Sequence, residues 1–240
     1  ILGGLNIDLN ATNQLVTIDG GGASGTLTGF VNVDVSGYAG FGGRITGLTT
    51  ATNTAVTGTG SVDVITTGAG NDTITDSAGA DVITTQAGDD SLTITAVGNV
   101  VDFGAGSDTL TLTDALFATL DTGSNGSYDG GDGSDTVSIS DASTAEDSEM
   151  VDFSNMEILD FTTALSTATL GANFEAAGFT TVDVTGASLA LTTAGLGTAA
   201  APIEITGYAV NTAAAKFATG GTAASAHTAT TGYTVTTGIY

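Results

Sequence analysis

Residues 67–93 read TGAGNDTIT DSAGADVIT TQAGDDSLT, three consecutive segments of nine residues that share one pattern. Each segment has Gly at its fourth position, Asp at its sixth position and an aliphatic side chain at its eighth. In the first segment these are Gly70, Asp72 and Ile74. An internal repeat of this kind determines the architecture of the chain that carries it.

The nine-residue spacing extends on both sides of this stretch. Asp63 precedes Asp72 by nine residues, Asp108 follows Asp90 by eighteen, and Asp135 follows Asp108 by twenty-seven. Asn99 fills the position between Asp90 and Asp108 and still offers a side-chain oxygen. Residues 130–138 read GGDGSDTVS, which contains every defined element of the pattern G-G-x-G-x-D-x-U-x, where U is apolar.

The repeat predicts a flattened coil of short parallel strands. In each x-U-x triplet, U points inward and its two neighbours point outward. Nine residues form half a turn and eighteen form a full turn, so the intervening loops align along two edges. One edge carries Asp63, Asp81 and Asn99, and the other carries Asp72, Asp90 and Asp108. Asp carboxylates are the hard oxygen ligands that calcium prefers, and Gly permits the close approach of carbonyl groups to an ion.

This pattern resembles the RTX (repeats-in-toxin) calcium-binding nonapeptide family. The resemblance implies a β-roll in which several Ca²⁺ ions lie between loops one full turn apart, held by Asp carboxylates and by carbonyl groups of the glycine region. It implies sites at Asp63/Asp81, Asp72/Asp90 and Asp90/Asp108, and a site at Asp81/Asn99 that is weaker by one charge. The implied ligand residues are Asp63, Gly68, Gly70, Asp72, Gly79, Asp81, Gly88, Asp90, Asn99, Gly104, Gly106, Asp108, Gly131, Gly133 and Asp135.

The repeat departs from the family pattern in places. Thr59, Ser77 and Gln86 stand where the second Gly is expected, and Val97 stands where the fourth-position Gly is expected. Residues 114–125 interrupt the spacing and are interpreted as a degenerate or inserted half-turn. This interruption leaves open which loop lies next to the loop that ends at Asp135.

The flanks show the alternation of apolar and polar residues that is typical of half-buried strands. Examples are Leu5–Leu9, Val31–Val35, Val182–Thr185 and Ile203–Thr206. We therefore expect an all-β fold: a parallel β-roll or β-solenoid at 58–140, with solenoid flanks at 1–57 and 141–240. Separate β-sandwich domains beside the roll are the alternative.

The charge balance limits the partners of this chain. It has 26 Asp and Glu residues against 2 Lys and Arg residues, a formal net charge of −24. Such a surface attracts cations and repels nucleic acid and anionic lipid. Cys is absent, which excludes disulfides and thiolate metal sites. No apolar stretch reaches the roughly 18 residues of a membrane span.

No catalytic motif accompanies the repeat. The sequence lacks HExxH and GxSxG, and its single His227 has no acidic residue nearby. We therefore predict that the chain is not an enzyme. Its composition is similar to that of bacterial surface-layer and adhesin proteins that carry RTX repeats. This similarity implies a calcium-stabilised structural protein of the bacterial cell surface, exported by type I secretion, that assembles into a lattice or filament and contacts cell-surface glycan. The alternative is an RTX adhesin, or the calcium-binding module of a larger secreted enzyme or toxin.

Overall fold

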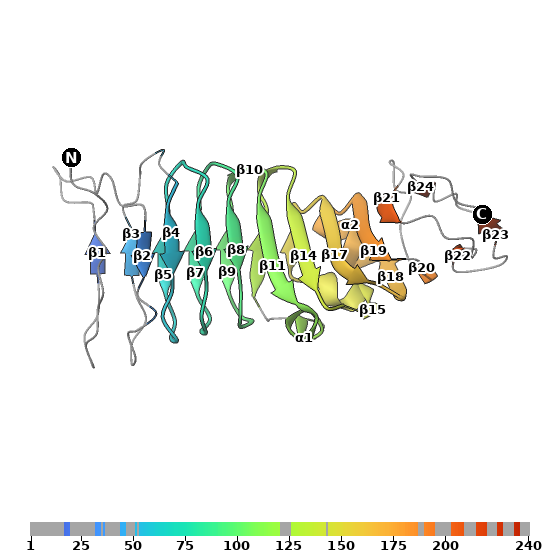
Figure 1. Ribbon diagram of the computed structural model, residues 1–240, viewed down its shortest axis with the longest axis horizontal. Coiled ribbons are helices and arrows are strands. Elements are labelled where there is room, and N and C mark those ends of the chain that lie inside the picture. Colours follow the sequence, from blue (N-terminus) through green and yellow to red (C-terminus); the bar gives the residue numbers. More distant parts are fainter. Residues whose placement is uncertain are drawn as a thin grey trace. The chain divides into compact units, whose positions relative to one another are not determined.

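The computed structural model describes residues 17–19, 32–34, 36, 44–46, 51, 53–120, 126–142, 144–186, 190–194, 203–208, 215–219, 225–227 and 233–235. The chain divides into two compact units. The first comprises Ile1–Thr111 and Ser124–Asp135, and the second comprises Leu112–Gly123 and Thr136–Tyr240. Both consist mainly of short strands in parallel sheets, which confirms the predicted all-β parallel fold (Figure 1). The domain boundaries expected at residues 57 and 140 stay a prediction.

In the first unit, successive strands alternate between two sheets, as expected when each half-turn contributes one strand. One sheet has the order β1-β3-β5-β7-β9-β12, and the other has the order β2-β4-β6-β8-β11. A further pair, β10-β13, lies in the loops. The strands are β1 (Thr17–Asp19), β2 (Asn32–Asp34), β3 (Arg44–Thr46), β4 (Ala55–Thr57), β5 (Val64–Thr66), β6 (Thr73–Thr75), β7 (Val82–Thr84), β8 (Ser91–Thr93), β9 (Val100–Asp102), β10 (Ala105–Gly106), β11 (Thr109–Thr113), β12 (Ser127–Asp129) and β13 (Asp132–Gly133).

The apolar position of each repeat forms the core of this coil. Ile65 pairs in register with Ile83, and Ile74 pairs with Leu92, so the stacked side chains lie one full turn apart. All four are at most 1% exposed, whereas the residues on either side of each one are exposed or half-buried. The expectation that nine residues form half a turn is confirmed. Because each half-turn between residues 58 and 93 buries only one aliphatic side chain, the core between the two sheets is thin there.

The interruption after β11 does not break the edge that carries Asp72, Asp90 and Asp108. Strand β13 pairs in parallel with β10, with Gly133 opposite Gly106. The loop that ends at Asp135 therefore lies next to the loop of Asp108, which answers the question that the sequence left open. The interrupting segment belongs to the second unit as far as Gly123 and contains the helix α1 (Asp114–Phe117), capped by the hydroxyl of Thr113.

The second unit also stacks strands in two sheets, with the orders β14-β17-β19-β21-β24 and β15-β18-β20-β22-β23. The strand pairs are parallel except for β21 with β24 and β22 with β23, which are antiparallel. The remaining elements are β14 (Thr136–Ser140), β15 (Thr144–Ala145), η2 (Asp147–Met150), β16 (Phe153–Ser154), β17 (Ile158–Ala164), β18 (Thr167–Gly171), α2 (Ala172–Ala177), β19 (Thr181–Gly186), β20 (Ala190–Ala194), β21 (Ile203–Tyr208), β22 (Ala215–Thr219), β23 (Ser225–His227) and β24 (Tyr233–Val235).

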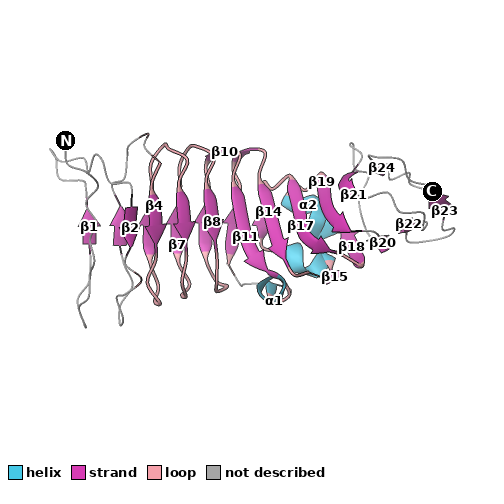
Figure 2. Ribbon diagram, viewed as in Figure 1, coloured by secondary structure: helices cyan, strands magenta, loops and turns pink. Residues whose placement is uncertain are grey.

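The second unit has a larger aromatic core than the coil, whose buried rings in the described residues are Phe103 and Tyr128. Phe117 stacks on Phe153 with ring centroids 6.3 Å apart, and Phe174 lies 5.3 Å from Phe179. Phe161 meets Phe117 edge-on. Figure 2 shows that the helices accompany this part of the chain, whereas the repeat at 58–111 contains only strands and loops. Burial of large rings supplies the second unit with a stronger apolar driving force than the half-turns between residues 58 and 93, which each bury one aliphatic residue.

The strands predicted in the flanks have the expected type where the structure describes them. Val33 lies in β2, Val182 in β19 and Ile205 in β21, whereas Leu5–Leu9 lies outside the described residues. In the described part of the chain, no helix has both the length and the apolar composition needed to cross a bilayer.

Candidate calcium-binding edges

A ladder of hydrogen bonds from backbone to carboxylate connects the turns along one edge of the coil. The N–H of Asp72 donates to Oδ1 of Asp90 at 2.6 Å, and the N–H of Asp90 donates to Oδ1 of Asp108 at 2.7 Å. The ladder begins at Thr54, whose N–H donates to Asp72, and ends at Asp135, which accepts from Asp108 at 2.8 Å. The structure thus places the predicted Asp72, Asp90, Asp108 and Asp135 in one column.

The opposite edge carries a shorter ladder. The N–H of Asp63 donates to Oδ1 of Asp81 at 2.6 Å, and the N–H of Asp81 donates to Oδ1 of Asn99 at 2.9 Å. Asp63 differs from the other Asp residues because both of its oxygens accept from Thr59, one from the backbone N–H and one from the hydroxyl. The first loop of this edge is therefore closed by Thr59, one of the residues that replace a pattern Gly.

The second carboxylate oxygen decides what these columns can bind. Oδ2 of Asp72, Asp81, Asp90 and Asp108 is buried and accepts no hydrogen bond within the described part of the chain. These four side chains are at most 2% exposed. A buried anionic oxygen without a partner is strongly unfavourable, and a cation between the turns would remove that cost. The residues present therefore fit a bound divalent cation.

Burial perturbs the acidity of these groups. It raises the pKa of Asp90 to about 6 and the pKa of Asp108 to about 7, against the hydrogen bonds that each accepts from the preceding turn. Burial, together with the neighbouring carboxyl group of Asp76 and the charge of Asp63, raises the pKa of Asp81 to about 8. Burial also raises the pKa of Asp135. Without a counter-ion, the columns therefore hold protons more tightly than free carboxylates do.

The pattern glycines allow the loops to stack at close range. A Cβ on Gly133 would lie 1.5 Å from the carbonyl oxygen of Gly106, and a Cβ on Gly106 would lie 1.9 Å from that of Gly88. Both glycines have φ of 155°, a conformation that side chains disfavour. The carbonyl groups of successive loops consequently follow the same edge as the carboxylates. Calcium takes six to eight oxygen ligands, and carbonyl groups commonly complete such a shell.

The other predicted glycines belong to the same loops. Gly79, Gly88, Gly104 and Gly131 have positive φ. Gln86 stands in line with Gly104 and adopts φ of 74°, and its side-chain amide donates to the carbonyl of Thr67. This contact between turns accompanies the strained backbone at the position where the pattern has Gly. Gly68 and Gly70 lie in the loop before Asp72.

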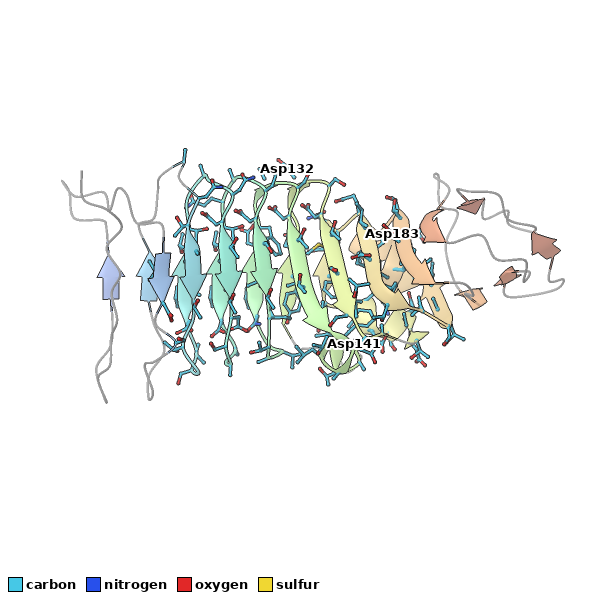
Figure 3. All side chains as sticks on the ribbon, viewed as in Figure 1. Asp132, Asp141 and Asp183 are labelled. Atoms are coloured by element: carbon cyan, nitrogen blue, oxygen red, sulfur yellow. The ribbon has the colours of Figure 1, made fainter. Side chains whose placement is uncertain are left out.

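Two features of these edges were not predicted from the sequence. An exposed ladder runs beside the column, in which the N–H of Asp89 donates to Asn71 and the N–H of Ser107 donates to Asp89. Asp76 is buried at the first position of its nonapeptide, a position outside the G-x-G-x-D signature. Asp132, by contrast, is exposed at the loop edge (Figure 3).

Side chains alone do not complete a metal site. Among the described residues, no three His, Cys, Asp or Glu side chains are grouped so that they could hold a metal ion. A cation on either edge would therefore be held by carboxylates from adjacent turns together with loop carbonyl groups. This donor set consists entirely of oxygen, which suits Ca²⁺ and not a transition metal.

Comparison with known proteins agrees with this geometry. A search of curated proteins and a search of solved structures each find no match to the chain. The family model of the RTX calcium-binding nonapeptide repeat matches residues 57–92. Repeats of this family bind calcium, and proteins that carry them are typically exported by type I secretion. Residues 57–92 are thus identified as four copies of the RTX calcium-binding nonapeptide repeat.

Proposed function

We propose that the chain is a calcium-stabilised structural segment of a bacterial cell-surface protein, a surface-layer or filament subunit. The observation that carries this proposal is the column of buried carboxylates at Asp72, Asp90 and Asp108, each with one oxygen that accepts no hydrogen bond from any described residue. Ions between the turns would hold the coil together and make it rigid. The predicted ligand residues, and the presence of several ions, belong to this proposal.

Bound calcium would supply the stabilising free energy that the small apolar core of the coil does not provide. One buried aliphatic side chain contributes about 1.5–3 kcal/mol, whereas ordering each residue of a half-turn costs roughly 1–2 kcal/mol. For a dissociation constant of about 100 μM, millimolar calcium adds about 1.4 kcal/mol per site. The same ions neutralise stacked carboxylates that would otherwise repel one another.

This dependence on calcium suits export. The submicromolar calcium of a cytoplasm leaves the sites empty, so the coil would remain unfolded and extensible during type I secretion. Millimolar calcium outside the cell would then drive folding. The same ion that stabilises the coil would thus restrict its folding to the extracellular side.

Outward residues of the coil support self-assembly. Val82 and Val100 lie in register on β7 and β9 and are 42% and 51% exposed. Asp102 and Asp129 lie in register on the adjacent strands β9 and β12. An exposed apolar column beside stacked acids provides a surface for contact with a neighbouring molecule, reinforced by bridging calcium. Contact with cell-surface glycan is a further part of the proposal.

Electron microscopy tests the assembly. We expect ordered sheets or filaments in millimolar calcium and dispersed particles in a chelator. A protein that stays monomeric while circular dichroism shows a calcium-dependent fold would contradict a lattice role. A protein whose circular dichroism is unchanged by calcium would contradict the calcium role itself.

The second candidate is an RTX adhesin, or the calcium module of a larger secreted enzyme or toxin. It is favoured by the separate aromatic core of the second unit, around Phe117, Phe161 and Phe174, which could carry a function of its own. Binding of the monomer to a glycan array in calcium would support this candidate. We propose that the chain itself is not catalytic.

A further inference from the structure

The edge that carries Asp81 contains a carboxylate that the repeat does not require. Asp76 occupies the first position of its nonapeptide, where the equivalent residues of the neighbouring repeats are Thr67 and Thr85. Those two hydroxyls donate to backbone carbonyls of the next turn. Side chains at this position therefore lie inside the coil, beneath the loop. Asp76 likewise is only 1% exposed.

Asp76 and Asp81 form a buried acidic pair. The carboxyl group of Asp76 is close enough to raise the pKa of Asp81, and Asp81 is fully buried. Oδ1 of Asp76 and Oδ2 of Asp81 accept no hydrogen bond from the residues that the structure describes. Two ionised carboxylates cannot donate to one another, so this pair holds either a shared proton or a bound cation. The sequence offers no basic residue from 58 to 140 that could neutralise the pair.

Asn99 orients this pair. Its Oδ1 accepts from the N–H of Asp81 at 2.9 Å, and its Nδ2 lies 3.4 Å from Oδ2 of Asp76. Nδ2 also donates to the carbonyl of Ala96 at 3.2 Å. The amide thus engages one oxygen of Asp76 and leaves the other toward Asp81. An Asp at position 99 would instead bring a third carboxylate into the same place.

We propose that Asp76 is an additional calcium ligand that restores the charge lost at Asn99. The site comprises the carboxylates of Asp76 and Asp81, with the shell completed by loop carbonyl groups, and Asn99 contacts the carboxylate of Asp76 and the backbone of Asp81. The site between the turns of Asp81 and Asn99 then carries two carboxylates, as the sites formed by Asp pairs on the other edge do. The inference rests on the proposed calcium-binding function and modifies the expectation that this site is weaker by one charge.

Calcium counting tests the assignment. The full chain, folded in calcium, is measured by equilibrium dialysis against ⁴⁵Ca²⁺, with circular dichroism to verify the fold. We expect Asp76→Asn to lose one bound ion per chain. The matched control Asp141→Asn removes an exposed carboxylate that lies outside the repeat and should lose none. The double variant D76N/N99D returns a carboxylate to the repeat position and should regain the ion.

The outcomes distinguish failure of the proposed calcium-binding function from failure of the role assigned to Asp76. If the wild type binds no calcium, the proposed function fails together with this inference. If the wild type binds several ions and D76N binds the same number, only the role of Asp76 is overturned, and a shared proton joins the acidic pair instead. Should D76N fail to fold, the D76N/N99D variant decides whether Asp76 is a ligand. If this variant regains both the fold and the bound ion, a carboxylate at position 99 can replace the one removed at position 76. A double variant that folds without the ion would also overturn the inference.

Discussion

The backbone N–H of Asp108 donates to Oδ1 of Asp135 at 2.8 Å, although 27 residues separate them. Elsewhere in the column the same bond joins residues 18 apart, such as Asp90 and Asp108. The chain therefore accommodates a longer turn without interrupting this edge. Continuity of the column matters because each interior Asp faces two neighbouring turns, so its substitution should disturb the contacts on both sides.

The first prediction concerns Asp90. Asp90→Asn keeps the Oδ1 acceptor for the N–H of Asp72 but replaces the buried second oxygen by an amide group. In millimolar calcium we expect a loss of about 1.4 kcal/mol or more, because at least one site loses a charged ligand. In a chelator, where the wild-type coil is largely unfolded, the variant should instead increase the folded fraction, since it removes a buried charge that repels Asp72 and Asp108. Circular dichroism measures both effects, through thermal unfolding in calcium and through the folded fraction in a chelator.

Asp89→Asn is the matched control for that variant. Asp89 lies next to Asp90 but is exposed, and the oxygen that accepts from Ser107 is retained in Asn. We expect the change to stay within about 0.5 kcal/mol in either condition, as for most surface substitutions. Equal effects of the two variants would show that net charge, and not the buried oxygen, governs stability.

The second prediction concerns loop stacking. Gly133→Ala would place a methyl group 1.5 Å from the carbonyl oxygen of Gly106, so the loops must separate. We expect a loss of about 3 kcal/mol or more in calcium, with weaker ion binding. Gly60→Ala is the control, because a Cβ there meets no described atom within 4 Å. Comparable Tm values for the two variants would show that the close approach of the loops is dispensable.

The third prediction concerns pH in the absence of calcium. An Asp in the unfolded chain titrates near 3.9, whereas burial raises the pKa values of Asp90, Asp108 and Asp81 to about 6, 7 and 8. Their contribution is therefore fully present below about pH 4 and is lost as pH rises through 6 to 8. We expect the folded fraction of calcium-free protein, followed by circular dichroism, to rise as pH falls from 8.5 to 5. A flat profile would contradict the burial of these carboxylates.

Calcium should reverse that dependence. The ion binds the deprotonated carboxylates, so acidification makes protons compete with it and weakens binding. Titration of calcium at pH 5.5 and pH 8 should show tighter binding at the higher pH, with release of protons at the lower pH. Equal affinities at the two values would indicate that carbonyl groups, and not the buried Asp residues, hold the ion.

Periodicity predicted the columns but not everything that they contain. Asp72, Asp90 and Asp108 recur at fixed spacing, so a coil with a constant turn length places them together. Asp76 was not predicted because the neighbouring repeats carry Thr67 and Thr85 at its position, and its proposed role depends on the single replacement at Asn99. The neighbour of Asp135 could not be derived, because the length of an inserted segment does not reveal whether the next loop returns to the same edge.

The side-chain contacts of the second unit also could not be predicted from the repeat or from the alternation of apolar and polar residues. Asp147 accepts from the N–H groups of Gly171, Asn173 and Phe174, which lie 24 to 27 residues away at the beginning of α2. Neither alternation nor spacing relates these residues. The aromatic cluster likewise joins Phe residues from α1, α2 and the strands, and no local pattern in the sequence marks them as partners.

The fourth prediction uses Asp147 to separate the two units. Its carboxylate accepts hydrogen bonds from the N–H groups of Gly171, Asn173 and Phe174 at the start of α2, with N···O distances of 2.7, 3.1 and 2.9 Å. Asp147→Ala should cost about 1–3 kcal/mol in the second unit, because these donors lose a charged partner. The loss should be the same with calcium and with a chelator, since the aromatic core provides the cohesion of this unit.

Hydrogen exchange measures both units in one experiment. In the wild type, a chelator should abolish protection of the amides of Asp72 and Asp90, whose N–H groups donate to carboxylates of the next turn. Protection at Val182 and Val184, buried in β19, should persist. Asp147→Ala should lower protection at Val182 and leave the calcium response of Asp90 unchanged. Simultaneous loss of protection in both units on chelation would show that calcium supports the aromatic unit as well, and that its rings do not suffice to hold it folded.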